Sequence, residues 1–172
     1  MAQFLDSTPT PPREETSPKD TSPDIIGKLR GMIQEISRDE DYDVEKIEDG
    51  FIMDIPVLYK SEECESDTCE EVRRQFVYIT ANRKSGDGED MYQVFTICAP
   101  EDERFYKSAL LLNMNLPFGA IAISQVEGKS YFVLVDTYLV SDVSTKEMEL
   151  SILSLAKAGD RIEKILVGDD LS

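Results

Sequence analysis

Several groups of side chains in this sequence have types and spacings that could support chemistry. The first is Asp39-x-Asp41-x-Asp43, which is typical of the start of a calcium-binding loop. An EF-hand also needs glycine at the sixth position and glutamate at the twelfth. This chain has Val44 and Gly50 there. The pattern therefore predicts a solvated helix end and turn, and no metal site.

The second group is the cysteines Cys64, Cys69 and Cys98. A structural zinc site needs about four nitrogen or sulfur ligands, and the chain has no histidine to complete the set. The acidic residues around Cys64 and Cys69 disfavour the reactive thiolate form. An odd, low number of cysteines is typical of a reducing compartment. We therefore expect a cytoplasmic protein without a metal or a cofactor.

The third group is a pair of aspartates, Asp54 and Asp136, within apolar segments expected to be strands. A buried carboxyl group has a raised pKa and can act as a general acid. The sequence leaves open whether either aspartate is buried or lies at a wet strand edge. The absence of histidine excludes Ser-His-Asp and Cys-His catalysis. We expect no catalytic residue and no enzyme; an enzyme that uses carboxylates alone is the remaining alternative.

Composition narrows the class of partner. The chain has 172 residues, with 18 Lys and Arg against 35 Asp and Glu, giving a net charge of −17. This charge argues against nucleic acid and anionic membranes, because phosphate binding needs concentrated basic residues. No apolar run approaches the roughly 18–20 residues of a membrane span, and the first residues lack the features of a signal peptide. A basic protein or peptide is the partner that this charge favours.

The proline and hydrophobic patterns divide the chain into a tail and one domain. Five of the eight prolines fall in the first 23 residues, among serines and threonines, so residues 1–22 are expected to form a disordered tail. Residues 23–168 are expected to form a single α+β domain with an acidic loop over 59–74, and 169–172 a C-terminal tail. The hydrophobic content of 41% is enough for a core.

Hydrophobic spacing and turn residues predict the elements of this domain. A capping box, Ser144-x-x-Glu147, is expected to begin the last helix. The expected helices are 23–38, 100–115 and one starting at 144; the expected strands are 42–47, 51–58, 75–81, 91–98, 119–124 and 130–140. Strands in consecutive hairpins make an antiparallel sheet. The predicted order is therefore helix, strands, helix, two strands, helix.

Two of these strands are apolar on both sides, which predicts a surface for a partner. In 75–81 and 91–98 apolar residues occupy alternate positions of either parity. Helices must cover one face of the sheet, and the other stays exposed unless a helix, a second subunit, the tail residues Phe4-Leu5 or a client peptide covers it. The residues expected to contact a partner are Phe76, Tyr78, Tyr92 and Val94.

A resemblance to a known family rests on the segment Leu112-Asn113-Met114-Asn115-Leu116-Pro117-Phe118-Gly119, which ends a predicted helix before a hairpin and a capped helix. This segment resembles the bacterial YbjN-like family, whose fold is similar to that of type III secretion chaperones of the CesT kind. The resemblance implies a fold with a helix, three strands, a helix, two or more strands and a final helix. It also implies a protein-handling or regulatory module that is often dimeric.

These observations together predict a non-enzymatic, chaperone-like module that holds a partner polypeptide on the surface or edge of its sheet. The alternative is a small regulatory domain that acts through homodimerisation and its N-terminal tail. The sequence leaves open which of the two applies.

Overall fold

The computed structural model describes residues 23–38, 42–60 and 70–167. Helix α1 (Pro23–Ile36) begins with proline, whose missing N–H costs nothing at the first helical position. Its apolar residues recur every three or four positions, and Ile25, Leu29, Met32 and Ile36 are buried as that spacing predicts. The predicted tail, 1–22, lies outside the described residues.

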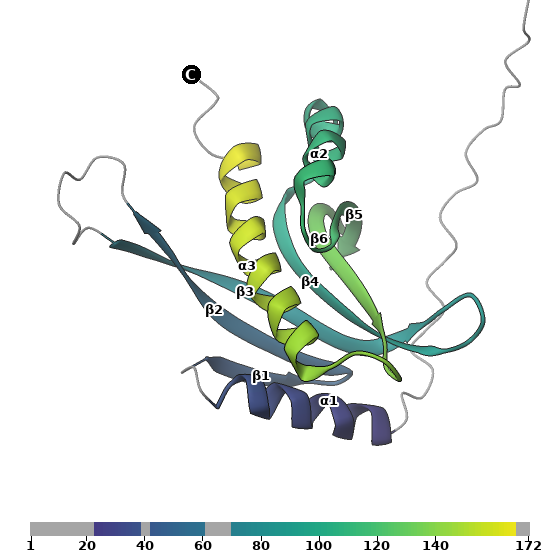
Figure 1. The fold of residues 1–172 in the computed structure, drawn as a ribbon. Helices are drawn as coiled ribbons and strands as arrows, with labels where there is room; N and C mark the ends of the chain where they lie inside the picture. The colour runs from purple at the N-terminus through teal and green to yellow at the C-terminus, as the bar shows by residue number, and fades with distance from the viewer. Residues whose placement is uncertain (1–22, 39–41, 61–69, 168–172) are drawn as a thin grey trace, which may run out of the picture.

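The strands form one antiparallel sheet with the order β1-β2-β3-β4-β6-β5 within the described residues (Figure 1). Their bounds are β1 (Asp43–Ile47), β2 (Gly50–Lys60), β3 (Glu70–Lys84), β4 (Asp90–Pro100), β5 (Ala120–Val126) and β6 (Lys129–Leu139). Strands β1 to β4 pair in chain order, and the segment with α2 leads from β4 to β5, so that β6 and not β5 lies beside β4. The predicted α+β class, with its antiparallel sheet and its order of elements, is confirmed.

The predicted acidic loop over 59–74 is wrong at both of its ends. Strand β2 continues to Lys60 and pairs with β3 from Glu70 onward, so only 61–69, which lie outside the described residues, separate the two strands. Leu58 and Val72, near the ends of this ribbon, are both exposed. The two residues are opposite one another on one face of the ribbon, whereas Val57 on the other face is buried. The exposed face tolerates polar side chains, which is why polar composition misidentified this part of the strands as a loop.

The predicted helix over 100–115 is also shorter than expected. Pro100 still belongs to β4, and the helix α2 (Tyr106–Leu112) lies between the 3-10 turns η1 (Glu103–Phe105) and η2 (Asn113–Asn115). The Asp102 carboxylate accepts a hydrogen bond from the Arg104 N–H at 2.9 Å and so caps η1. The helical segment therefore begins at the acidic residue Glu103, three residues after Pro100.

Helices α1, α2 and α3 (Thr145–Val167) all pack on the same face of the sheet. The Tyr92 hydroxyl of β4 donates to the Ile25 carbonyl of α1 at 3.1 Å, and the Ser151 hydroxyl of α3 donates to Asp136 of β6 at 3.2 Å. Tyr106 of α2 makes an edge contact with the Phe132 ring of β6. Figure 1 shows α3 crossing in front of the sheet. One face is therefore covered, and we call its opposite the open face.

Helix α3 follows the sequence prediction closely. The Ser144 N–H and hydroxyl both donate to the Glu147 carboxylate, at 3.0 and 2.9 Å, and the Glu147 N–H donates back to the Ser144 hydroxyl, as a capping box requires. The predicted apolar face of the helix is buried along its length: Met148, Ile152, Leu155, Gly159, Ile162 and Leu166. Gly159 lies so close to β4 that an added Cβ would come within 2.6 Å of the Thr96 methyl carbon.

Candidate functional site

The predicted metal and redox candidates do not assemble into a site among the described residues. Asp43 is in β1 and makes an ion pair with Arg74 at 3.1 Å. The remaining members of these groups, Asp39, Asp41, Cys64 and Cys69, lie outside the described residues. Cys98 is a buried free thiol in β4, and burial raises its pKa to about 12, which keeps it protonated. No group of three metal-ligating side chains is found in the described part of the chain.

The aspartates Asp54 and Asp136 are on opposite faces of the sheet. Asp54 pairs across the ladder with Phe76 on the open face, and its carboxylate accepts a hydrogen bond from Arg74 Nε at 2.7 Å. Asp136, on the covered face, accepts hydrogen bonds from the hydroxyls of Tyr138 at 2.7 Å and Ser151 at 3.2 Å. The sheet separates the two carboxylates, so they cannot act together as an acid–base pair. Asp136 instead ties β6 to α3.

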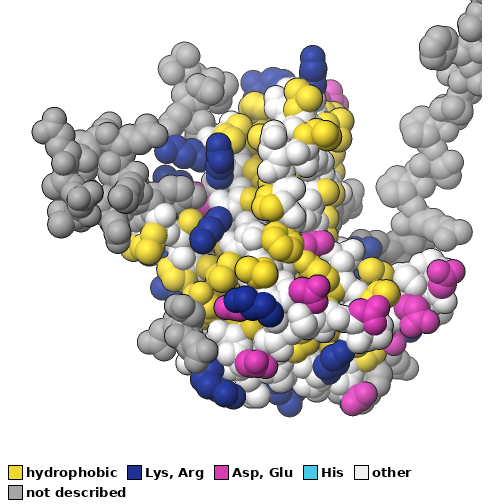
Figure 2. Space-filling model, in the orientation of Figure 1, with side chains coloured by type: hydrophobic (Ala, Val, Ile, Leu, Met, Phe, Trp, Pro, Cys, Tyr) yellow, Lys and Arg dark blue, Asp and Glu magenta, His cyan; other side chains and the backbone are white. Residues whose placement is uncertain are grey.

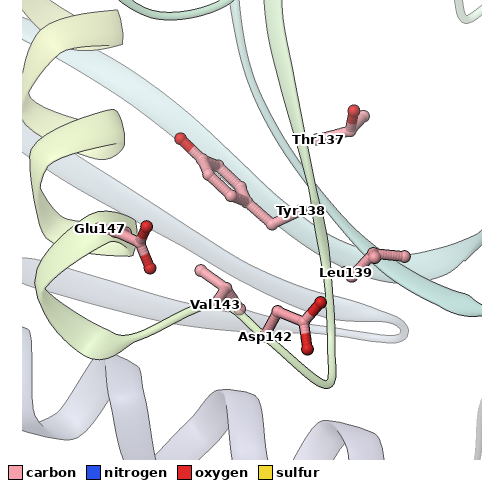
Figure 3. Close-up of a pocket in the computed structure, with 6 residues that line it drawn as sticks. All are labelled: Thr137, Tyr138, Leu139, Asp142, Val143 and Glu147. Carbon is pink, nitrogen blue, oxygen red and sulfur yellow. The ribbon is translucent and has the colours of Figure 1, made fainter.

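A cavity of about 200 Å³ lies where β6 leads into α3 (Figure 3). The Tyr138 ring points towards α3, and Glu147 lies across from it, whereas Thr137 and Leu139 point away (Figure 3). Two of the polar groups here are already engaged: Glu147 belongs to the capping box, and the Tyr138 hydroxyl donates to Asp136. Burial is the largest of the causes that raise the pKa of Tyr138 to about 12. We assign these groups to holding α3 in place.

The open face is the part of the molecule with the best developed surface for a partner. None of the helices in the described residues lies on it, and its apolar side chains come from four strands: Ile52, Phe76, Tyr78, Phe95, Ile97 and Val135. Phe76 is 52% exposed. Tyr78 and Phe95 are opposite one another, and their rings stack at 4.9 Å. The result is an apolar, aromatic surface along the centre of the sheet.

The structure separates the four predicted contact residues. Phe76 and Tyr78 are on the open face, but Tyr92 and Val94 are completely buried on the covered face. Tyr92 and Val94 are therefore corrected from partner contacts to core residues. Burial and the nearby Asp24 carboxylate raise the pKa of Tyr92 to about 12, so its hydroxyl stays a hydrogen-bond donor.

A β-bulge explains this error and why Phe95 and Ile97 of β4 were not predicted as contact residues. Next to the hairpin turn, Lys84 is opposite Asp90, which places even-numbered residues of both strands on the same face. The bulge between Thr80 and Arg83 shifts the register by one residue, and a shift of one exchanges the faces. The stacked pair of aromatic residues is the signal that could have revealed the correct register.

Two arginines on the open face are held by hydrogen bonds to neighbouring strands. Arg74 donates both to Asp54, at 2.7 Å, and to Asp43, at 3.1 Å. At the other end of the sheet, Arg83 donates to Gln93 at 3.2 Å. These contacts place the two arginines at the ends of the apolar surface, which itself consists of aliphatic and aromatic side chains. Such a surface favours contact with a polypeptide over contact with a polyanion.

A second apolar surface lies on α2 and its C-terminal turn. Leu110, Leu111 and Met114 are all exposed, Met114 by 84%. Figure 2 shows hydrophobic side chains gathered over this helix. We call these three residues the α2 patch. It is separate from the open face, because α2 packs on the opposite side of the sheet.

No known family model matches the chain, and no characterised protein matches it. The resemblance to YbjN-like proteins and to type III secretion chaperones therefore stays a prediction. Among the described residues, no helix is both long and apolar enough to cross a membrane.

Proposed function

We propose that this chain is a non-enzymatic, chaperone-like protein-binding module that holds an extended segment of a partner polypeptide on its open face. The observation that carries the proposal is the apolar surface around the stacked Tyr78 and Phe95, with half-exposed Phe76 beside it and no helix of the described residues over it. Exposed apolar surfaces of this kind are typical of protein–protein contacts. Asp54 accepts a hydrogen bond from Arg74, and Asp136 accepts hydrogen bonds from Tyr138 and Ser151, which supports a structural role for both carboxylates.

The order α1, four strands, α2, two strands, α3 has one strand more before α2 than the expected chaperone-like order and otherwise agrees with it, which supports such an arrangement as part of this proposal. A cytoplasmic location is compatible with it, because the cysteine in the described residues, Cys98, is a free thiol.

Affinity capture from native lysate with the full chain tests this function. The wild type is compared with a Phe76→Ser/Tyr78→Ser variant and with a Leu111→Ser/Met114→Ser variant that alters only the α2 patch. We expect polypeptides that the wild type and the α2 variant enrich and the open-face variant loses. Enrichment that is the same for all three, or none at all, would contradict the proposed function.

The α2 patch favours a second candidate, a regulatory domain that acts through homodimerisation. A patch of leucine and methionine side chains on one short helix can pair with a symmetric copy. The N-terminal tail of this alternative lies outside the described residues. Sedimentation velocity decides it: we expect a dimer that the Leu111→Ser/Met114→Ser variant converts to a monomer, and a monomeric wild type would contradict it.

A further inference from the structure

The sheet is split along part of the boundary between β3 and β4. Their ladder ends at the pair Tyr78 and Phe95, and no further pairing of the two strands is formed beyond it within the described residues. Side chains replace the missing backbone bonds. Gln75 Nε2 donates to Thr96 Oγ1 at 2.6 Å and to the Ile97 carbonyl at 3.2 Å. The Thr96 hydroxyl in turn donates to the Phe76 carbonyl at 2.8 Å.

A cavity of about 310 Å³ lies at this split. We call it the notch; its lining residues are Arg74, Gln75, Phe76, Tyr78, Ile97 and Glu163. Phe76, Tyr78 and Ile97 belong to the open face, whereas Gln75 and Glu163 belong to the covered face and to α3. The notch therefore connects an aromatic entrance on the open face with a carboxylate on the helix side.

Two carboxylates, Asp160 and Glu163, and the guanidinium of Arg73 interact on the helix side of the notch. Asp160 lies one helical turn before Glu163 and is 3% exposed, and its Oδ2 has no hydrogen-bond partner among the described residues. Arg73 makes a long ion pair with Asp160, with its nitrogen 3.9 Å from Oδ1. Burial and the charge of Asp160 raise the pKa of Glu163, and the charge of Arg73 opposes part of this shift. Arg74, at the rim, is already bound to Asp54 and Asp43.

We propose that the notch receives the side chain of one lysine or arginine from a partner segment that lies on the open face, with the cation directed to Glu163. This inference rests on the proposed function and specifies the chemistry of the partner. Long basic side chains pack their methylene groups on apolar walls while the charged end reaches a polar site, and the rings of Phe76 and Tyr78 add a favourable surface for a cation. The net charge of −17 also favours the approach of a basic segment.

Peptide binding by the full chain tests the notch. The probes are four fluorescent nonapeptides with alternating valine and threonine, whose central residue is lysine, arginine, norleucine or glutamate. We expect fluorescence anisotropy to show binding of the lysine and arginine peptides about fivefold tighter than that of the norleucine peptide, the effect of one partly solvated ion pair. The glutamate peptide should bind most weakly.

Charge reversal at Glu163 provides the decisive comparison. Glu163→Gln should abolish the preference for lysine over norleucine, and Glu163→Lys should invert it so that the glutamate peptide binds best. Glu149→Lys makes the same change of charge on the same helix, about 21 Å away at 1.5 Å per residue, and should keep the wild-type order. Circular dichroism checks that each variant is folded.

Two results would overturn the proposal that the notch binds a basic side chain, while leaving the proposed function intact. One is equal binding of the lysine and norleucine peptides by the wild type, and the other is the same inversion in Glu149→Lys as in Glu163→Lys. Failure of all four peptides to bind also overturns it. The proposed function itself fails only if, in addition, capture from lysate does not depend on Phe76 and Tyr78.

Discussion

Val77, Ile79 and Val94 on the covered face of the sheet are completely buried, whereas Phe76, the neighbour of Val77 on the open face, is 52% exposed. Both faces are apolar and alternate along the same strands, so their difference comes from the helices that cover one of them. Full burial of a phenylalanine side chain stabilises a folded protein by about 1.5–3 kcal/mol relative to leaving that side chain exposed. Part of this free energy is still available on the open face, which is why we assign stability to one face and binding to the other.

The largest expected effect is on the covered face. Leu155 of α3 is completely buried, so Leu155→Ala should lower the free energy of unfolding by about 3 kcal/mol through lost burial and a cavity. Urea denaturation measures this change. A loss below about 1 kcal/mol would show that α3 does not seal this face as tightly as its burial indicates.

The approach of α3 to the sheet gives the second prediction. Gly159→Ala places a Cβ within 2.6 Å of the Thr96 methyl carbon, and overpacking of this kind should cost about 2 kcal/mol. The matched control is Gly31→Ala in α1, where nothing lies within 4 Å of the added carbon. The control should gain about 0.5–1 kcal/mol from helix propensity. Similar effects of the two substitutions in thermal unfolding would contradict the close contact.

The capping box gives a smaller effect with a characteristic pH dependence. Ser144→Ala should cost about 1 kcal/mol at neutral pH. Hydrogen bonds from the backbone and then the hydroxyl of Ser144 lower the pKa of Glu147. A lowered folded pKa stabilises the protein above the unfolded pKa, and this stability is lost as the pH falls through the folded pKa. Urea unfolding across the acidic range should therefore show a smaller loss in the variant than in the wild type; equal losses would contradict this.

The smallest expected change in stability is on the open face. Phe76→Ser should alter the free energy of unfolding by no more than about 0.5 kcal/mol, as for most surface substitutions. Val77→Ser, at the next position of β3, replaces a completely buried side chain and should cost several times as much. Denaturation of the two variants side by side checks the comparison. A large loss in Phe76→Ser would mean that this ring belongs to the core.

The local elements could be predicted because their causes are local. The reciprocal hydrogen bonds of Ser144 and Glu147 need only three residues of separation, and Asp49-Gly50 ends the first hairpin turn where its sequence indicates. The buried face of α3 followed from its 3.6-residue period. The extent of β2 and β3 was missed, because polar side chains interrupt the apolar alternation where one face of this ribbon is exposed.

The candidate site was predicted only in part, for a reason that lies in the pairing of strands. Phe76 and Tyr78 were identified, but the bulge between Thr80 and Arg83 moved Phe95 and Ile97 onto the open face and took Val94 into the core. A one-residue shift of register changes which side chains share a face, and nothing in either strand alone reports it. The notch was also unpredictable, because it joins residues of β3 and β4 with Glu163 of α3.

The sequence by itself determined the class of fold, the order of the elements and the caps and turns, since each depends on residues a few positions apart. The tertiary structure decided which face the helices cover, which aromatic residues remain accessible and where the sheet splits. These depend on register and on long-range packing, in which several arrangements satisfy the same alternation of apolar residues and only the contacts of α1 and α3 with the sheet select one.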